Sequence, residues 1–402
     1  KCKNRTKCNS KDFQTETQRG ELKFNKSNFL SVFASANLAN NSCLPRNKGL
    51  AHLLLLSKQI NQLVRRDMQK VFITGITGFL GSHLAKKMFE AGWFVAGNDN
   101  LIGSDRSNLH GFVEFFEIDC CDLDAMQKAM AGSDLVFHCA ATAHEGLSVF
   151  SPSFITKNNY EASVSTFTAA INCGVQRIVF CSSMARYGDQ PSPFTEEMRP
   201  QPVDPYGIAK FAAEETLKVL CDVHGVQWNI AVPHNIVGEG QKYDDPFRNV
   251  ISIMLNRNLQ GLPSVIYGDG QQTRCFSYID DCVSCLVKMG LDENITRQII
   301  NIGPDEEVIT INELASMCAN ETGLNEPPSY YKSGRPQEVM HASCSSDKAR
   351  KILQYETKTS VAVAIKKTAD FIRVNGVKKF DYHIPIEIVN DKTPKTWTEK
   401  TI

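Results

Sequence analysis

The order of apolar segments in this 402-residue chain predicts an α/β protein built on a doubly wound parallel sheet. Short runs rich in β-branched and aromatic residues alternate with longer runs of helical periodicity, as in βαβ units, whose crossover helices cover both faces of a sheet. A glycine-rich turn follows the first run, and an acidic residue ends the second. The expected strands cover residues 71–74, 94–97, 113–118, 135–140, 177–182 and 228–232.

The glycine turn has the pattern Gly75-x-x-Gly78-x-x-Gly81 and leads from the first expected strand into a helix-like run. Glycine meets three needs here: a free backbone in the turn, close approach of a pyrophosphate, and tight packing of helix on strand. N–H groups of the first helical turn would then face the phosphate charge. A turn that merely ends a strand is the alternative. The pattern predicts a Rossmann-type unit that binds a dinucleotide beyond the carboxyl ends of its strands.

Asp99 ends the second expected strand, about 20 residues after the turn, where such units place an acid on the adenosine ribose hydroxyls. A carboxylate at this position would repel the 2′-phosphate of NADP, so the predicted cofactor is NAD. The alternative interpretation is that Asp99 and Asn100 only start a turn.

The net charge of zero conceals two regions of opposite charge. Residues 1–67 carry 13 Lys or Arg and 4 Asp or Glu, so the rest of the chain has a balance of −9 and no basic surface that indicates nucleic acid. We expect 1–67 to be a disordered or non-native extension ahead of Met68, with a transit peptide as the alternative. Its apolar stretch at 50–56 is too short for a membrane span, and no membrane association is predicted.

Eleven of the 14 cysteines follow Met68, scattered through apolar runs. An odd number in such positions predicts free thiols in a reducing compartment, and hence a cytoplasmic protein. Cys282 and Cys285 have C-x-x-C spacing, but without a second such pair no metal site is predicted.

Tyr206 and Lys210 are four residues apart in a helix-like segment and therefore share one face. A phenol with a pKa near 10 is a poor base at neutral pH, but a neighbouring ammonium and a nicotinamide charge would stabilise its phenolate. The pair alone also fits an ordinary surface helix. Ser183 favours catalysis, because it ends an earlier strand and can hydrogen-bond the same reacting oxygen.

In combination these motifs resemble the extended short-chain dehydrogenase/reductase family, in particular nucleotide-sugar epimerases and dehydratases of the UDP-glucose 4-epimerase type. The resemblance runs from Met68 to about Phe371 and includes TGITGFLG, FEIDCCD, FHCAA, CSSMARYG, YGIAK, GDGQQTRCFSYIDD, NIG and GRP. It implies that Ser183, Tyr206 and Lys210 are catalytic. The NAD contacts it implies are Gly75, Gly78, Phe79, Leu80, Gly81, Asp99, Asn100, Asp119, Cys120, Cys139, Ala140, Ala141, Tyr206, Lys210 and His234, and the substrate contacts are Ser183, Asn235, Arg274 and Arg335.

The two arginines also suit their implied role on physical grounds. A buried diphosphate needs forked donors with a permanent charge, which Arg supplies better than Lys. Taken singly, Arg274 or Arg335 could be a solvated surface charge.

The reaction type is predicted from the residues after Ser183, where the family's dehydratases and decarboxylases typically carry an acid. Met184 and Ala185 stand there instead. Without an acid, elimination lacks its proton donor, and oxidation followed by re-reduction of one carbon is favoured. The predicted activity is NAD-dependent epimerisation of a nucleotide-activated sugar, at C4 of a UDP-hexose or UDP-N-acetylhexosamine, through a transient 4-keto intermediate. The alternatives are an NAD(P)-dependent nucleotide-sugar dehydratase or reductase, and a non-catalytic NAD-binding sensor.

Three features depart from the family pattern: Arg186 in place of a small apolar residue, Cys275 in place of Asp, and the unfamiliar segment 142–146. They could signal a different sugar or a different carbon.

The expected domain organisation is an NAD-binding domain at 68–237 with later returns at about 272–303, and a smaller substrate-binding lobe mainly at 238–379. Residues 380–402 would form a C-terminal arm with a strand at 384–389, reaching a partner subunit. The family resemblance further implies a homodimer formed through helices at 159–173 and 205–224.

Overall fold

The computed structural model describes residues 68–331 and 334–402, so the predicted extension at 1–67 lies outside the described residues. A seven-stranded parallel sheet forms the core of the described chain, in the order β11-β6-β5-β4-β1-β2-β3. The predicted fold class is thereby confirmed. The strands are β1 (Lys70–Thr74), β2 (Phe94–Asp99), β3 (Glu114–Glu117), β4 (Leu135–His138), β5 (Arg177–Cys181), β6 (Gln227–Pro233) and β11 (Gln298–Ile302).

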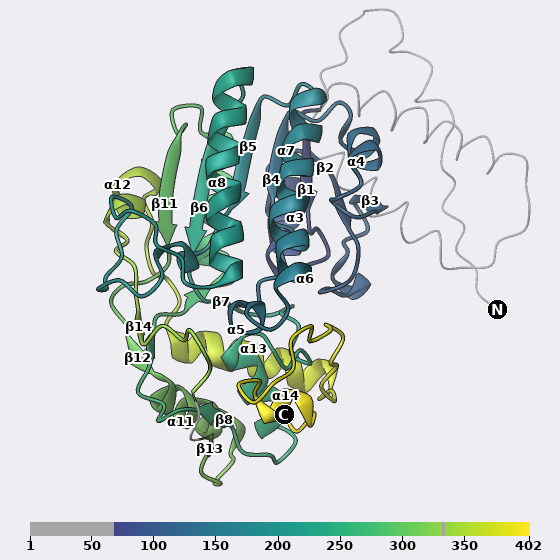
Figure 1. The fold of residues 1–402 in the computed structure, drawn as a ribbon. Coiled ribbons are helices and arrows are strands. Elements are labelled where there is room, and N and C mark those ends of the chain that lie inside the picture. The colour runs from purple at the N-terminus through teal and green to yellow at the C-terminus, as the bar shows by residue number, and fades with distance from the viewer. Residues whose placement is uncertain (1–67, 332–333) are drawn as a thin grey trace, which may run out of the picture. The chain divides into compact units, whose positions relative to one another are not determined.

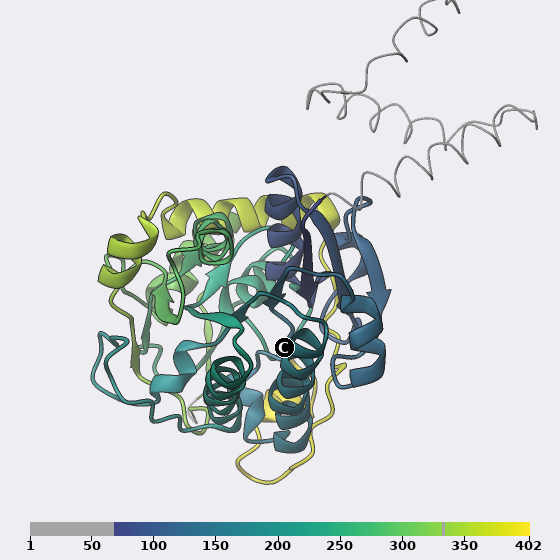
Figure 2. The same ribbon diagram turned by 90° about the horizontal axis from the view of Figure 1, so that it is seen from above.

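Helices cover both faces of the sheet (Figures 1 and 2). One layer contains α3 (Phe79–Glu90) and α10 (Ile279–Leu291), and the other contains α4 (Leu123–Met130), α7 (Ala162–Asn172) and α8 (Pro205–His224). Side chains of β1 alternate between the two layers: Val71 and Ile73 belong to one apolar cluster and Phe72 to the other, all fully buried. This alternation explains why the strand reads as a continuous apolar run.

A smaller lobe lies at the end of the sheet where the parallel strands finish, below it in Figure 1. It is built from short strand pairs and from helices that share one apolar cluster with α3 and α10. The strands are β7 (Ile236–Val237), β8 (Val265–Tyr267), β9 (Thr273–Arg274), β10 (Ser277–Tyr278), β12 (Ile309–Thr310), β13 (Ser329–Tyr331) and β14 (His341–Ala342). The helices are α9 (Val250–Asn258), α11 (Ile311–Thr322) and α13 (Val361–Asn375), whereas α12 (Asp347–Leu353) packs beside β11 and α10.

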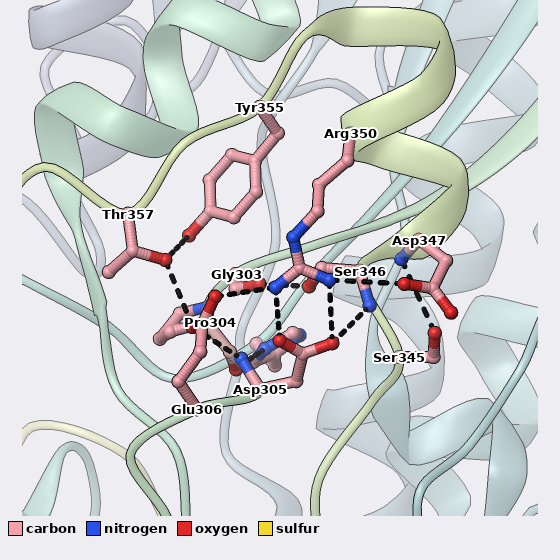
Figure 3. A network of polar contacts seen from close by, with 11 residues as sticks. Gly303, Pro304, Asp305, Glu306, Ser345, Ser346, Asp347, Arg350, Tyr355 and Thr357 are labelled. Atoms are coloured by element: carbon pink, nitrogen blue, oxygen red, sulfur yellow. Dashed lines mark hydrogen bonds and ion pairs between the residues drawn. The ribbon is translucent and has the colours of Figure 1, made fainter.

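The chain returns to the sheet after it first enters the lobe, because α10 packs on α3 and β11 pairs with β6. A polar network fixes the turn after β11 (Figure 3). Arg350 of α12 binds the carboxylates of Asp305 and Glu306, and the Ser346 N–H donates to Asp305 Oδ2 at 2.9 Å. Because Ser346 Oγ also donates to the Gly303 carbonyl, this network attaches α12 to the carboxyl end of β11.

The C-terminal arm does not form the predicted strand at 384–389. Its backbone is irregular up to α14 (Lys395–Thr398), and the N–H groups of Glu387 and Ile388 both donate to the Phe150 carbonyl, at 2.9 and 2.8 Å. Ile384 and Trp397 are instead buried singly in an apolar cluster on the same chain. The apolar spacing of the segment therefore reflects separate anchors rather than one face of a strand.

Candidate active site

Two adjoining cavities lie where the sheet meets the lobe. We call them the catalytic cavity, of about 330 Å³, and the nucleotide cavity, of about 110 Å³. Their shared lining residues are Phe79, Leu80, Cys139, Ala141 and Arg248. A ligand as long as a dinucleotide can therefore extend from one cavity into the other.

The glycine turn forms one wall of the nucleotide cavity and has no room for side chains. Gly75 has a φ of +67°, and a Cβ there would lie 2.9 Å from Ala140 Cα. At Gly81 a Cβ would lie 2.1 Å from the Gly75 carbonyl oxygen. Helix α3 begins directly after Gly78 without a side-chain cap, so its first N–H groups are available to a ligand. This cradle fits a pyrophosphate.

Asp99 lines the nucleotide cavity at the end of β2 and also organises the following turn. Its Oδ1 accepts hydrogen bonds from the Leu101 N–H and from Ser104 Oγ, each at 2.9 Å. Asp99 therefore starts a turn and also lines the cavity. A carboxylate there would accept hydrogen bonds from ribose hydroxyls and would repel a 2′-phosphate. The other predicted NAD contacts that line this cavity are Gly75, Gly78, Phe79, Leu80, Gly81, Asn100, Asp119, Cys120, Cys139, Ala140 and Ala141.

His234, another predicted NAD contact, is not among the residues that line the two cavities. Its side chain is fully buried, and its Nε2 lies 3.1 Å from the Pro304 carbonyl oxygen. A Cβ at Gly303 would lie 2.3 Å from this ring. His234 therefore packs under the turn after β11, where Nε2 bonds Pro304 and the buried Nδ1 has no partner among the described residues.

Helix α8 brings Tyr206 and Lys210 to the catalytic cavity. Asp204 caps the helix by accepting a hydrogen bond from the Gly207 N–H at 2.9 Å, and Pro205 occupies the first turn. A Cβ at Gly207 would lie only 2.6 Å from the Ala185 carbonyl oxygen. Glycine at this position thus lets the helix approach the turn that carries Ser183.

Tyr206 is 5 % exposed, and its phenol lies near Ser183. Burial raises the pKa of the phenol above its ordinary value, and the neighbouring Glu145 raises it further, while Ser183 and Arg248 oppose the rise. The protein atoms alone thus move this pKa in the direction opposite to the predicted one, because desolvation outweighs the nearby positive charge.

Lys210 lies beneath the catalytic cavity and is almost completely buried. Its Nζ donates to the Cys181 carbonyl at 2.9 Å and lies 4.8 Å from the centre of the Phe180 ring. Burial lowers its pKa to about 8. The ammonium is therefore held in one place by the end of β5, ready to pair with an added oxygen or negative charge.

Arg274 and Arg335 converge at another part of the catalytic cavity, joined by a carboxylate that the sequence did not predict. Glu338 Oε1 accepts from Arg335 Nη2 at 2.8 Å and lies 3.6 Å from Arg274 Nη2. Glu338 thus holds the two guanidinium groups side by side in the cavity wall. The short spacing between Arg335 and Glu338 was the available signal for this residue.

Glu145, at the start of α5 (Glu145–Ser148), supplies a carboxyl group to the catalytic cavity. It is exposed to the cavity, but the surrounding protein and the charge of Asp204 raise its pKa to about 7, against the opposing effect of Arg274 and Arg335. The expectation that no acid is available holds for Met184 and Ala185 but is wrong for the cavity as a whole. The unfamiliar segment 142–146 was the sequence signal.

The remaining predicted substrate contact, Asn235, lines the catalytic cavity with a left-handed φ of 44°. Its Nδ2 donates to the carbonyl of the buried Cys275 at 2.8 Å. Arg186 is also buried, and its Nη2 lies 3.1 Å from Glu214 Oε2. Two of the three departures from the family pattern are thus interior residues that hold the site in shape.

Further cavity residues come from segments without a regular sequence pattern. Phe247 and Arg248 precede α9, and Trp397 and Ile402 belong to the C-terminal arm. The Trp397 ring packs edge-on against Phe247, with ring centres 5.3 Å apart. Only the folded chain identifies these side chains as part of the site.

Comparison with known proteins decides the family. A model of the NAD-dependent epimerase/dehydratase family matches residues 71–303, which is more than half of the chain. The chain belongs to the NAD-dependent epimerase/dehydratase family. NAD is accordingly its cofactor, and the glycine cradle and Asp99 fit that ligand.

Two curated relatives and one solved structure illustrate what this family member is similar to. The UDP-glucose 4-epimerase of Mycolicibacterium smegmatis is 29% identical, over 76% of this chain and 98% of the relative. The UDP-N-acetyl-alpha-D-glucosaminuronate decarboxylase of Bacillus cytotoxicus is 31% identical, over 61% and 78%. The UDP-glucose 4-epimerase of Thermotoga maritima, solved with UDP-glucose, has a TM-score of 0.72 and 29% identity, over 76% of this chain and 99% of that one.

No helix within residues 68–331 and 334–402 is both long and apolar enough to cross a membrane. Nor do three or more His, Cys, Asp or Glu side chains there converge as a metal site requires.

Proposed function

We propose that this protein interconverts the two configurations at C4 of a UDP-hexose or UDP-N-acetylhexosamine. The observation that carries the proposal is the catalytic cavity itself, in which Tyr206, Ser183 and Lys210 lie beside the nucleotide cavity and Arg274 and Arg335 also face the same space. Relatives that act on UDP-sugars at C4 support the choice of substrate and carbon.

The roles of the side chains follow from their contacts. The Tyr206 oxygen accepts the proton of the sugar 4-hydroxyl and later returns it, while Ser183 hydrogen-bonds the oxygen whose charge changes. Lys210, which lines the same cavity and whose Nζ is bound to the Cys181 carbonyl, would hold the cofactor ribose and stabilise the phenolate form. The glycine cradle and Asp99 would hold NAD, which would supply the hydride chemistry needed to oxidise C4 and to reduce the 4-ketose from its other face. Arg274 and Arg335 hold the diphosphate during that turn of the sugar ring.

The test is NMR of the sugar ring protons in NAD-supplemented reactions with UDP-hexoses, UDP-N-acetylhexosamines and UDP-uronic acids. We expect axial and equatorial H4 signals to interconvert without net NADH. Tyr206→Phe should abolish this exchange, whereas Tyr160→Phe, which changes a hydroxyl 3.3 Å from Thr216 outside both cavities, should not. A keto or deoxy product, or accumulating NADH, would refute 4-epimerisation. Full biological effect of Tyr206→Phe would indicate a non-catalytic NAD sensor.

Glu145 supports a second candidate, dehydration or decarboxylation of a nucleotide sugar. An acid with a pKa of about 7 can donate a proton at neutral pH, and a decarboxylase is among the relatives. Release of water or CO2 that disappears in Glu145→Gln would establish this chemistry. Unchanged C4 exchange in that variant would exclude an essential proton transfer by Glu145.

We also propose a cytoplasmic homodimer formed through α7 and α8, which pack side by side on one face of the sheet (Figure 1). Ile208 and Val219 of α8 support the dimer, because they are 53% and 62% exposed and their spacing places them on one helix face. The free thiols of the described cysteines support a reducing compartment. Light scattering on Ile208→Glu should report a monomer where the parent is a dimer.

A further inference from the structure

Arg248 lies at the junction of the two cavities and lines both. Among the described residues around the nucleotide cavity, it alone carries a fixed positive charge. The other candidate, His144, is neutral: burial lowers its pKa, and its Nε2 donates to Asp245 at 2.8 Å while its buried Nδ1 has no partner in the described chain. Protonating Nδ1 would create an unsatisfied buried donor.

The nucleotide cavity needs positive charge if it is to hold a pyrophosphate. Two carboxylates, Asp99 and Asp119, already line it. The N-terminus of α3 supplies only about half an elementary charge. Two negative charges of a pyrophosphate would therefore meet a cavity with an excess of negative charge unless Arg248 took part.

The guanidinium of Arg248 is available for such a ligand. In the described part of the chain it takes part in no ion pair or hydrogen bond, unlike Arg274 and Arg335, which share Glu338. Its charge acts on Tyr206, Lys210 and His144. The side chain therefore lies within electrostatic reach of both the catalytic residues and the segment beside the glycine cradle.

The backbone around Arg248 is fixed by buried neighbours. Asp245 accepts a hydrogen bond from His144 and another from the Phe247 N–H, at 2.9 Å. The Phe247 ring packs against Trp397 of the C-terminal arm. The backbone that carries Arg248 is thus fixed in advance at the junction, so that binding has to order only the side chain.

We propose that Arg248 binds the pyrophosphate of NAD, so that a residue of the smaller lobe clamps the cofactor held by the sheet domain. The proposal rests on family membership and not on the reaction at C4. It explains how the cofactor could remain bound while sugar nucleotides enter and leave the adjoining cavity.

The test measures cofactor binding directly, by titrating nucleotide-free protein with NAD and with adenosine, which lacks the pyrophosphate. Arg248→Met should weaken NAD binding about 10- to 100-fold, as expected for a charge-assisted bond, and leave adenosine binding unchanged. Arg248→Lys should restore part of the NAD affinity. The matched control is Lys242→Met, because Lys242 is a cation of the same segment that lines neither cavity.

Unchanged adenosine binding also shows that the variant is folded. NAD binding by Arg248→Met equal to that of the parent would overturn the proposal. The proposal would also be overturned if Arg248→Met bound NAD as the parent does and lost only the turnover of UDP-uronic acids. That result would show that Arg248 binds the carboxylate of the substrate. Because these titrations need no sugar turnover, failure of the proposed 4-epimerisation would leave their outcome unaffected.

Discussion

Replacing Lys210 with methionine should make the nucleotide-free protein more stable at neutral pH while abolishing its activity. Burial moves the pKa of this ammonium from an ordinary value of 10.5 to about 8. A difference of that size corresponds to a cost of about 3 kcal/mol for burying the charged form. Methionine has a similar length and removes this cost, but it also removes the hydrogen bond to the Cys181 carbonyl, which is worth about 1 kcal/mol. The expected net gain is about 2 kcal/mol.

The effect of Lys210→Met on stability should depend on pH. Below pH 8 the lysine is protonated in both the folded and the unfolded chain, so the cost is fully present. Between about pH 8 and 10.5 the unfolded chain still binds the proton when the folded protein has released it, and parent stability rises with pH. The advantage of Lys210→Met should therefore fall from about 2 kcal/mol at pH 7 to less than about 1 kcal/mol at pH 9.5.

Urea unfolding followed by circular dichroism at the two pH values provides the measurement. The matched control is Lys366→Met, because Lys366 is exposed. This variant should change the free energy of unfolding by the same small amount at both pH values. A variant less stable than the parent at pH 7, or an advantage independent of pH, would show that Lys210 is not a desolvated charge.

Three further predictions concern other cavity residues. Trp397→Ala should lower the free energy of unfolding in urea by about 3 to 5 kcal/mol and raise the KM for the sugar nucleotide, because the ring is buried and lines the catalytic cavity. Trp397→Phe should recover most of the stability. An unchanged unfolding midpoint in Trp397→Ala would contradict the packing. Asp99→Ser should raise NADP affinity relative to NAD in parallel titrations, and an unchanged ratio would exclude repulsion by this carboxylate. Glu145→Gln should raise the Tm at pH 8 but not at pH 4.5. The pKa of this carboxyl is raised from 4.5 to about 7, so ionising it in the folded protein costs stability as the pH rises through that range. An equal effect on the Tm at both pH values would contradict the raised pKa.

The fold, and the convergence of Ser183, Tyr206 and Lys210 on one cavity, could be predicted from the sequence because short-range constraints place them. Gly75 has a left-handed φ of +67°, and Gly81 is required by its contact with the Gly75 carbonyl in the same turn. Tyr206 and Lys210 share a face because one helix carries both. The strand ends of a parallel sheet converge on one edge whatever the details of the loops. Such features depend on few residues, and those residues are neighbours in the chain.

The other cavity residues depend on contacts between distant segments. Glu145 follows His144, whose partner Asp245 is 101 residues away. Arg248 is placed by the same bond and by the packing of Phe247 on Trp397, far beyond it in the sequence. His234 shows the converse: its motif position indicated a cofactor contact, but Pro304 and Gly303 enclose the ring. No local pattern could decide these cases.

This division between local and long-range placement also locates substrate choice. An epimerase and a decarboxylase are similar to this chain at nearly the same identity, 29% and 31%, so overall similarity does not rank the possible reactions. Ser183 follows β5, and Tyr206 and Lys210 lie on α8. Glu145, Arg248 and Trp397 reach the cavity from three separate segments, two of which are the short helices α5 and α14. Those segments contact one another through the His144–Asp245 bond and the Phe247–Trp397 rings, so a substitution in one shifts the cavity wall formed by the others. Substrate specificity should therefore change through coupled substitutions in 142–146, 244–250 and the arm, and not through Ser183, Tyr206 or Lys210.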